Sequence, residues 1–183
     1  MSILSELYPS GVGGGLKPKF QEFLTSGTFT PSQALIDAGG LINVFLVASG
    51  GQNDLDRSAA GGEVIKKIMT LENLTPCNII IGASVTLTDG NDSSFSGSNA
   101  GGVDILSLGG ERVTRQINRM GAGWGALKTS AGFASAGTGT DGYGAGAGVA
   151  TYNGGVKLAK INSGQGAIFN DSGSGYCLIT WLE

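Results

Sequence analysis

The chain has 183 residues, including 34 glycines and 4 prolines, and 40% of its residues are apolar. Glycine and proline together stay below the roughly 25–30% that marks disordered low-complexity chains, so we expect one ordered, core-forming domain. The net charge is −3 and the 11 lysines and arginines are mostly dispersed, which argues against a nucleic-acid-binding surface. The chain has no histidine, which excludes Ser-His-Asp and Cys-His catalytic sets.

Residues 1–26 are interpreted as an N-terminal attachment arm. Its candidate interface residues are Ile3, Leu4, Leu7 and Tyr8. These apolar side chains have too few neighbours within the arm to fold alone, so we expect them to dock onto another subunit or a larger assembly. The alternative is a strand or tail packed on its own domain. Because Glu6 and Pro9 interrupt the segment and no basic region precedes it, we expect neither a secretion signal nor membrane insertion.

Residues 27–183 are interpreted as one all-β domain. Short β-branched segments alternate here with Gly, Asn, Asp and Ser, which predicts a β-sandwich with a jelly-roll-like arrangement. The predicted strands are residues 28–30, 41–48, 63–71, 77–81, 85–88, 103–108, 149–152, 156–161, 167–169 and 176–182. The helical candidate is residues 111–120, where Val113, Ile117 and Met120 share one face.

Within this domain, residues 109–150 are interpreted as a Gly/Ala-rich insertion. Residues 121–148 contain ten glycines, and those from Gly142 to Gly148 recur at every second position. In an extended chain they would all face one side and let another strand or subunit lie close. Triple-helical packing needs a period of three, so an extended layer or an ordered irregular loop is favoured, with a flexible loop as the alternative.

Two short patterns that suggest chemistry have ordinary explanations. Residues 137–142 match the dinucleotide fingerprint G-x-G-x-x-G, but glycines and alanines flank them on both sides where a strand and a helix are required. Chance in a glycine-rich chain explains this match.

Cys77 and Cys177 lie in separate apolar segments without a CxxC pattern, so we expect buried free thiols in preference to a disulfide.

Two pairs of aspartates are close in sequence. Asp54 with Asp56, and Asp89 with Asp92, resemble the paired carboxylates of glycosidases, but all four lie among turn-forming residues and are interpreted as turn caps. Residues 89–93 also resemble a calcium loop faintly, yet lack its glycine at position six and its closing glutamate. We therefore predict no catalytic residues, no metal site and no cofactor.

Aromatic residues are scattered through and beside the glycine-rich insertion. They are Trp124, Phe133, Tyr143 and Tyr152. Aromatic rings with small neighbours can stack on sugars or anchor protein partners, so these four are candidate receptor-binding residues. The alternative is packing over neighbouring strands or between subunits. Trp181, in the last predicted strand, is expected in the core or an interface.

Three segments carry a resemblance when taken in order. The first is GTFTP at residues 27–31, followed by the strand 42–48 and SGG. The second is AGGEV at residues 60–64 with the strand that follows, and the third is SGSGYCLITWLE at residues 172–183. Together they resemble the glycine-rich domain of bacteriophage tail-fibre and other virion appendage proteins.

The resemblance implies a non-enzymatic structural protein located in the virion. It implies a symmetric homo-oligomer, with a trimer favoured, attached to other virion proteins through the N-terminal arm. Contact with a host surface glycan or protein is the expected task of such an assembly. One alternative is a receptor-binding or carbohydrate-binding tip that uses Trp124 and Tyr143. A weaker alternative is a polysaccharide depolymerase that uses the aspartate pairs.

Overall fold

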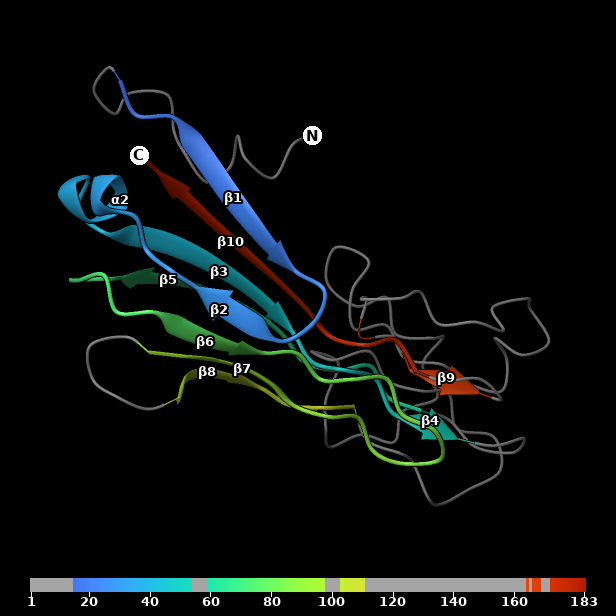
Figure 1. The fold of residues 1–183 in the computed structure, drawn as a ribbon. Coiled ribbons are helices and arrows are strands. Elements are labelled where there is room, and N and C mark those ends of the chain that lie inside the picture. Colours follow the sequence, from blue (N-terminus) through green and yellow to red (C-terminus); the bar gives the residue numbers. More distant parts are fainter. Residues whose placement is uncertain (1–14, 54–58, 98–102, 111–163, 165, 169–171) are drawn as a thin grey trace.

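The computed structural model describes residues 15–53, 59–97, 103–110, 164, 166–168 and 172–183. The described chain is all-β: it contains two four-stranded antiparallel sheets, a separate two-stranded parallel pair and one short helix (Figure 1). The elements are β1 (Pro18–Phe23), β2 (Gly27–Phe29), α2 (Gln33–Asp37), β3 (Leu41–Val47), β4 (Gln52–Asn53), β5 (Val64–Thr70), β6 (Cys77–Ile80), β7 (Ser93–Ser96), β8 (Val103–Ser107), β9 (Ala167–Ile168) and β10 (Tyr176–Leu182).

The first sheet has the strand order β1-β10-β3-β5. Successive side chains of β3 point to opposite faces of the sheet. Ile42, Val44 and Leu46 face the core and are buried, while the residues between them face outward. The register places Ile179 of β10 beside Val44, so the core-facing residues of the two central strands meet in one layer. The last strand therefore lies in the middle of this sheet, between β1 and β3.

The second sheet has the order β2-β6-β7-β8. Its core-facing row runs through Ile79, Phe95 and Ile105, which are paired across β6, β7 and β8 and are all buried. Phe29 of β2 extends this layer and meets Trp181 of β10 edge-to-face, with ring centroids 5.2 Å apart. The apolar layers of the two sheets thus form one core, with the predicted core residue Trp181 packed at its border.

The helix α2 is a single short turn with defined ends. Ser32 is its N-cap, and its hydroxyl accepts a hydrogen bond from the Leu35 amide at 3.0 Å. Gly39 and Gly40 end the helix with positive φ values, and the Gly40 amide donates to the Leu35 carbonyl. Leu35 is fully buried, so the turn covers one end of the core.

The structure confirms most of the predicted strands that it describes, and it adds four elements. β1, α2, β4 and β7 were not predicted, and β7 carries three serines in four residues, which gave no apolar signal. The prediction of a strand at residues 85–88 is wrong. Leu87 there has φ +55°, a left-handed conformation that no regular strand contains.

The N-terminal arm is described only in part. β1 lies within the range interpreted as the arm, and it pairs along its whole length with β10. The alternative interpretation, a strand packed on its own domain, therefore holds for this part. Residues 1–14 lie outside the described chain, as do the predicted helix 111–120 and the predicted strands 149–152 and 156–161.

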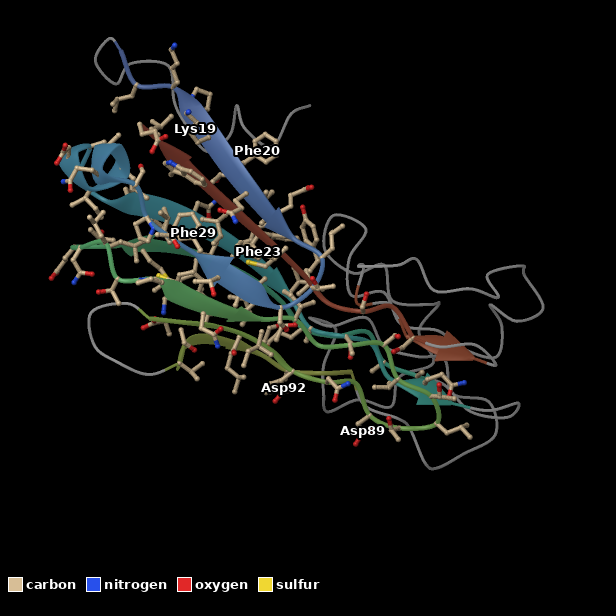
Figure 2. The ribbon with its side chains drawn as sticks, in the orientation of Figure 1. Lys19, Phe20, Phe23, Phe29, Asp89 and Asp92 are labelled. Atoms are coloured by element: carbon tan, nitrogen blue, oxygen red, sulfur yellow. The ribbon has the colours of Figure 1, made fainter. Side chains whose placement is uncertain are left out.

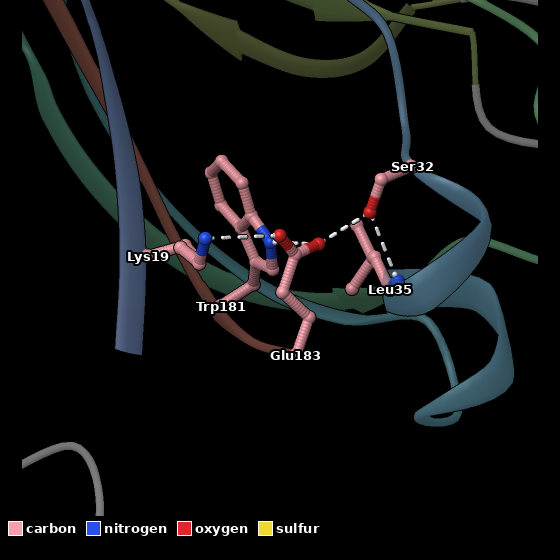
Figure 3. Close-up of polar contacts among 5 residues, drawn as sticks. All are labelled: Lys19, Ser32, Leu35, Trp181 and Glu183. Carbon is pink, nitrogen blue, oxygen red and sulfur yellow. Dashed lines mark hydrogen bonds and ion pairs between the residues drawn. The ribbon is translucent and has the colours of Figure 1, made fainter. Parts of the chain in front are cut away.

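A carboxylate joins β1, β10 and α2 (Figure 3). The Glu183 side chain forms an ion pair with Lys19 at 3.4 Å and accepts hydrogen bonds from the Trp181 indole and the Ser32 hydroxyl. These contacts hold the pKa of Glu183 below its ordinary value, and the hydrogen bond from Ser32 contributes most. The same Ser32 oxygen caps α2, so this contact links the helix to the sheet.

We predict that Glu183→Gln removes part of the dependence of stability on pH. Because the pKa of Glu183 is depressed in the folded state, its contribution is fully present above the ordinary pKa of about 4.5 and is lost as the pH falls through the folded value. Urea unfolding measured between pH 7 and pH 3 should show that the difference in unfolding free energy between wild type and variant becomes smaller at acid pH. A gap that widens on acidification contradicts the assignment, and Glu72→Gln, at an exposed position after β5, is the control.

Candidate functional site

Glycine-rich segments continue from one end of the two sheets, and we call them the glycine bundle. It consists of residues 48–52, 59–63, 82–92, 107–110, 164, 166 and 172–175. In Figure 1 these segments run beyond the strands toward the labels β4 and β9. Because the neighbouring strands are antiparallel, alternate segments enter and leave the bundle, and the sheets set their spacing.

The central segment of the bundle is residues 48–52. Its five consecutive amides donate to three different neighbouring segments, and the same neighbour returns at every third residue. The donor and acceptor residues are Ala48 to Glu63, Ser49 to Asn91, Gly50 to Gly173, Gly51 to Ala60 and Gln52 to Thr88, with N···O distances of 3.0–3.1 Å. In a β-sheet the same neighbour would return at every second residue. A period of three is that of the polyproline II helix, which has no internal hydrogen bonds.

A second pair of segments repeats this period. The Ser172 amide donates to the Val85 carbonyl at 3.1 Å, and the Gly175 amide donates to the Gly82 carbonyl at 2.8 Å. The two hydrogen bonds are three residues apart in each of the two segments. The Val85 amide returns a hydrogen bond to the Ser172 hydroxyl at 3.0 Å. The segment predicted as a strand at residues 85–88 therefore forms part of the bundle instead.

Backbones in the bundle approach too closely for side chains. At eight glycines an added Cβ would lie only 1.9–2.6 Å from a neighbouring carbonyl oxygen. These are Gly62, Gly82, Gly90, Gly109, Gly110, Gly164, Gly166 and Gly175. Contacts of that length do not occur in folded proteins, and the obstructing atom is backbone, which cannot rotate away. The glycines are thus a steric requirement of this packing.

Small polar side chains complete the bundle. Four of them are almost fully buried, and each accepts a hydrogen bond from a backbone amide through its side-chain oxygen. The acceptors and donors are Ser49 with Asn91, Ser93 of the adjoining strand β7 with Gly82, Ser172 with Val85, and Gln52 with Leu87. These hydrogen bonds offset the free-energy cost of removing the polar groups from water. The interior of the bundle is therefore polar, unlike the core between the sheets.

The aspartates of residues 89–93 project from the bundle's surface (Figure 2). Asp92 accepts a hydrogen bond from the Gly109 amide at 2.8 Å, and the Asn91 side-chain amide donates to the Ala83 carbonyl at 3.1 Å. These side chains join one segment to the next. Within the described part of the chain, His, Cys, Asp and Glu form no group of three that could hold a metal ion. Asp54 and Asp56 lie outside that part.

The two cysteines are buried free thiols, as predicted. Burial, with a smaller contribution from Asp104, raises the pKa of Cys77 to about 11, and burial raises the pKa of Cys177 to about 12. A thiol with such a pKa is protonated at neutral pH and is a poor nucleophile. Both therefore act as small core residues.

The predicted binding residues cannot be placed. The candidate receptor-binding residues Trp124, Phe133, Tyr143 and Tyr152 lie outside the described residues. So do the interface candidates Ile3, Leu4, Leu7 and Tyr8, and the alternating glycines 142–148. In the ranges that the structure describes, no helix has the length and apolar character needed to cross a membrane.

The period-three packing was not predicted from the sequence, although the sequence contains one signal for it. Six glycines of the bundle form pairs near strand ends, at residues 50–51, 61–62 and 109–110. Each pair alone reads as a turn. Comparisons with protein-family models, curated proteins and solved structures found no match to this chain.

We predict that Gly90→Ala destabilises the protein by about 2 kcal/mol or more, as for other overpacking changes. The new Cβ would lie 2.2 Å from the Ser49 carbonyl oxygen, in the centre of the bundle. The control is Gly27→Ala, whose Cβ meets only the Phe23 ring at 3.2 Å and which should cost below about 1 kcal/mol. Urea unfolding at pH 7 measures both. Equal stability of the two variants would contradict the close packing.

Proposed function

We propose that this chain is a non-enzymatic structural protein of a bacteriophage virion, a component of a tail fibre or head fibre that assembles as a symmetric oligomer. The observation that carries the proposal is the glycine bundle. A frame of hydrogen-bonded backbone with few side chains suits a protein whose task is durable shape and attachment. The jelly-roll-like arrangement belongs to the same proposal, as does attachment through the N-terminal arm predicted at residues 1–26, of which residues 18–23 form β1.

The topology supports the jelly-roll-like interpretation in two respects. The first described strand, β1, pairs with the last, β10, and the next strand, β2, lies in the opposite sheet. Pairing of early with late strands and passage of the chain from one sheet to the other are features of jelly rolls. The pairing of β3 with β5 in the same sheet, after residues 48–63, differs from that pattern.

A second candidate function is receptor binding at the tip of the assembly. The observation in its favour is that Gly110 and Gly164, which border the segment 111–163, both lie in the glycine bundle. The Gly110 amide donates to the Ser49 carbonyl at 2.9 Å, and the Gly164 carbonyl accepts from the Gly62 amide at 2.8 Å. The segment that carries the four candidate aromatic residues is therefore anchored at both ends to a rigid base, as binding loops commonly are.

The location of the protein tests the first proposal. We expect an antibody against the full chain to label fibres on purified phage particles in immunogold electron microscopy, because the proposed role requires permanent attachment. Mass spectrometry of the same particles should contain peptides of the chain in constant ratio to the major capsid protein. Recovery of the chain only from the soluble, particle-free fraction of a lysate would contradict a structural role in the virion.

A single substitution tests receptor binding. Trp124→Ala should reduce binding of the purified chain to host cells by about tenfold or more, the loss expected when an aromatic anchor is truncated. The mass of the assembly in solution should stay unchanged. Leu106→Ala, on the outer surface of β8, is the control and should bind as wild type does. Unchanged binding of Trp124→Ala removes this residue from the proposal.

A further inference from the structure

The face of the first sheet that points away from the core is unusually apolar. We call it the outer face. Phe20 on β1 and Ile68 on β5 are 65% and 63% exposed, and they lie at the two ends of one row across the sheet. Figure 2 shows Phe20 on the opposite side of β1 from the core residue Phe23. Leu41, at the start of β3, is a further exposed apolar residue, at 54%.

A second row crosses the outer face beside the first. It runs Glu22, Leu178, Phe45 and Lys66 in register over β1, β10, β3 and β5. The Lys66 ammonium lies 5.6 Å from the centroid of the Phe45 ring. At the other edge, the Tyr176 hydroxyl donates to the Glu22 carboxylate at 2.6 Å. The face therefore has an acidic edge at β1, a basic edge at β5 and apolar residues between them.

The edges of this sheet are unsuited to pairing with another strand. β1 begins with Pro18 and Lys19, and β5 contains Lys66 and Lys67. Proline and lysine on edge strands prevent edge-to-edge association. The Lys67 ammonium also donates to the Asp104 carbonyl at 2.9 Å, which closes the β5 side of the sandwich. Association through this sheet is therefore expected through its face.

We infer that the outer face binds the outer face of a second copy, related by a two-fold axis that runs along the strands between β10 and β3. The inference rests on the homo-oligomer proposed above and names its contact surface, and it replaces the trimer that the resemblance favours with an assembly of even copy number. Rotation about this axis does not shift residues along the strands, so each row of one copy lies over the same row of the other. It reverses the order of the strands across the sheet, so β1 of one copy lies over β5 of the other. Glu22 then faces Lys66 of the second copy, and Phe20 faces Ile68.

The experiment is sedimentation velocity on the full chain over a range of concentrations. We expect wild type to form assemblies with an even number of copies. Ile68→Lys should raise the dissociation constant by about tenfold or more, because it places a second positive charge beside Lys66 and removes apolar contact. Val103→Lys is the matched control, since Val103 is β-branched and 59% exposed but lies on β8 of the other sheet. Circular dichroism confirms that each variant folds.

Charge reversal tests the two-fold arrangement itself. Glu22→Lys and Lys66→Glu should each weaken association, and the double variant should restore it, because each reversed side chain again meets an opposite charge. Failure of the double variant to recover overturns this geometry, as does an assembly with an odd number of copies.

The remaining outcomes separate the two proposals. Assemblies that persist unchanged in Ile68→Lys overturn the surface and leave the proposed oligomer intact. A wild-type chain that stays monomeric at about 100 μM, well above the micromolar range of ordinary complexes, overturns both. A chain without residues 1–14 that dimerises while wild type does not shows that its own N-terminal segment occupies the face, and it also overturns the inference.

Discussion

The packing of backbone directly against backbone in the glycine bundle is the constraint on which the rest of the structure depends. Glycine loses more conformational freedom on folding than any other residue, so segments rich in it do not order by themselves. Here the two sheets hold the segments at fixed spacing, and the five amides of residues 48–52 donate in turn to carbonyls on three neighbouring segments. The apolar core between the sheets thus stabilises a polar assembly that has no core of its own.

The sandwich and the glycine bundle make different contributions to the function we propose. The sandwich supplies the free energy of burial, through residues such as Phe95 and Leu46, while the bundle supplies an extended rigid surface with few side chains. Because the bundle has few side chains, recognition of a partner depends on segments of the chain that connect to the bundle at both ends. In the proposed virion protein, attachment and recognition then belong to segments outside the frame, which can vary in sequence more freely than the frame itself.

Much of the sandwich could be predicted from local sequence, because alternating apolar residues identify strands such as β3 and β10. β7 could not be predicted, since its serines have no apolar period, and β1 was obscured by the polar residues around it. The glycine bundle escaped prediction for a different reason. Its period of three is distributed over segments that are far apart in the chain, so no stretch such as residues 48–52 displays it alone.

The position of β10 has a consequence for the order of folding. This strand, residues 176–182, lies between β1 and β3, both of which come much earlier in the chain. Until β10 is in place, the edges of β1 and β3 that it joins have no partner in this sheet. Completion of the sheet therefore depends on contacts between distant parts of the sequence, a topology associated with slow folding.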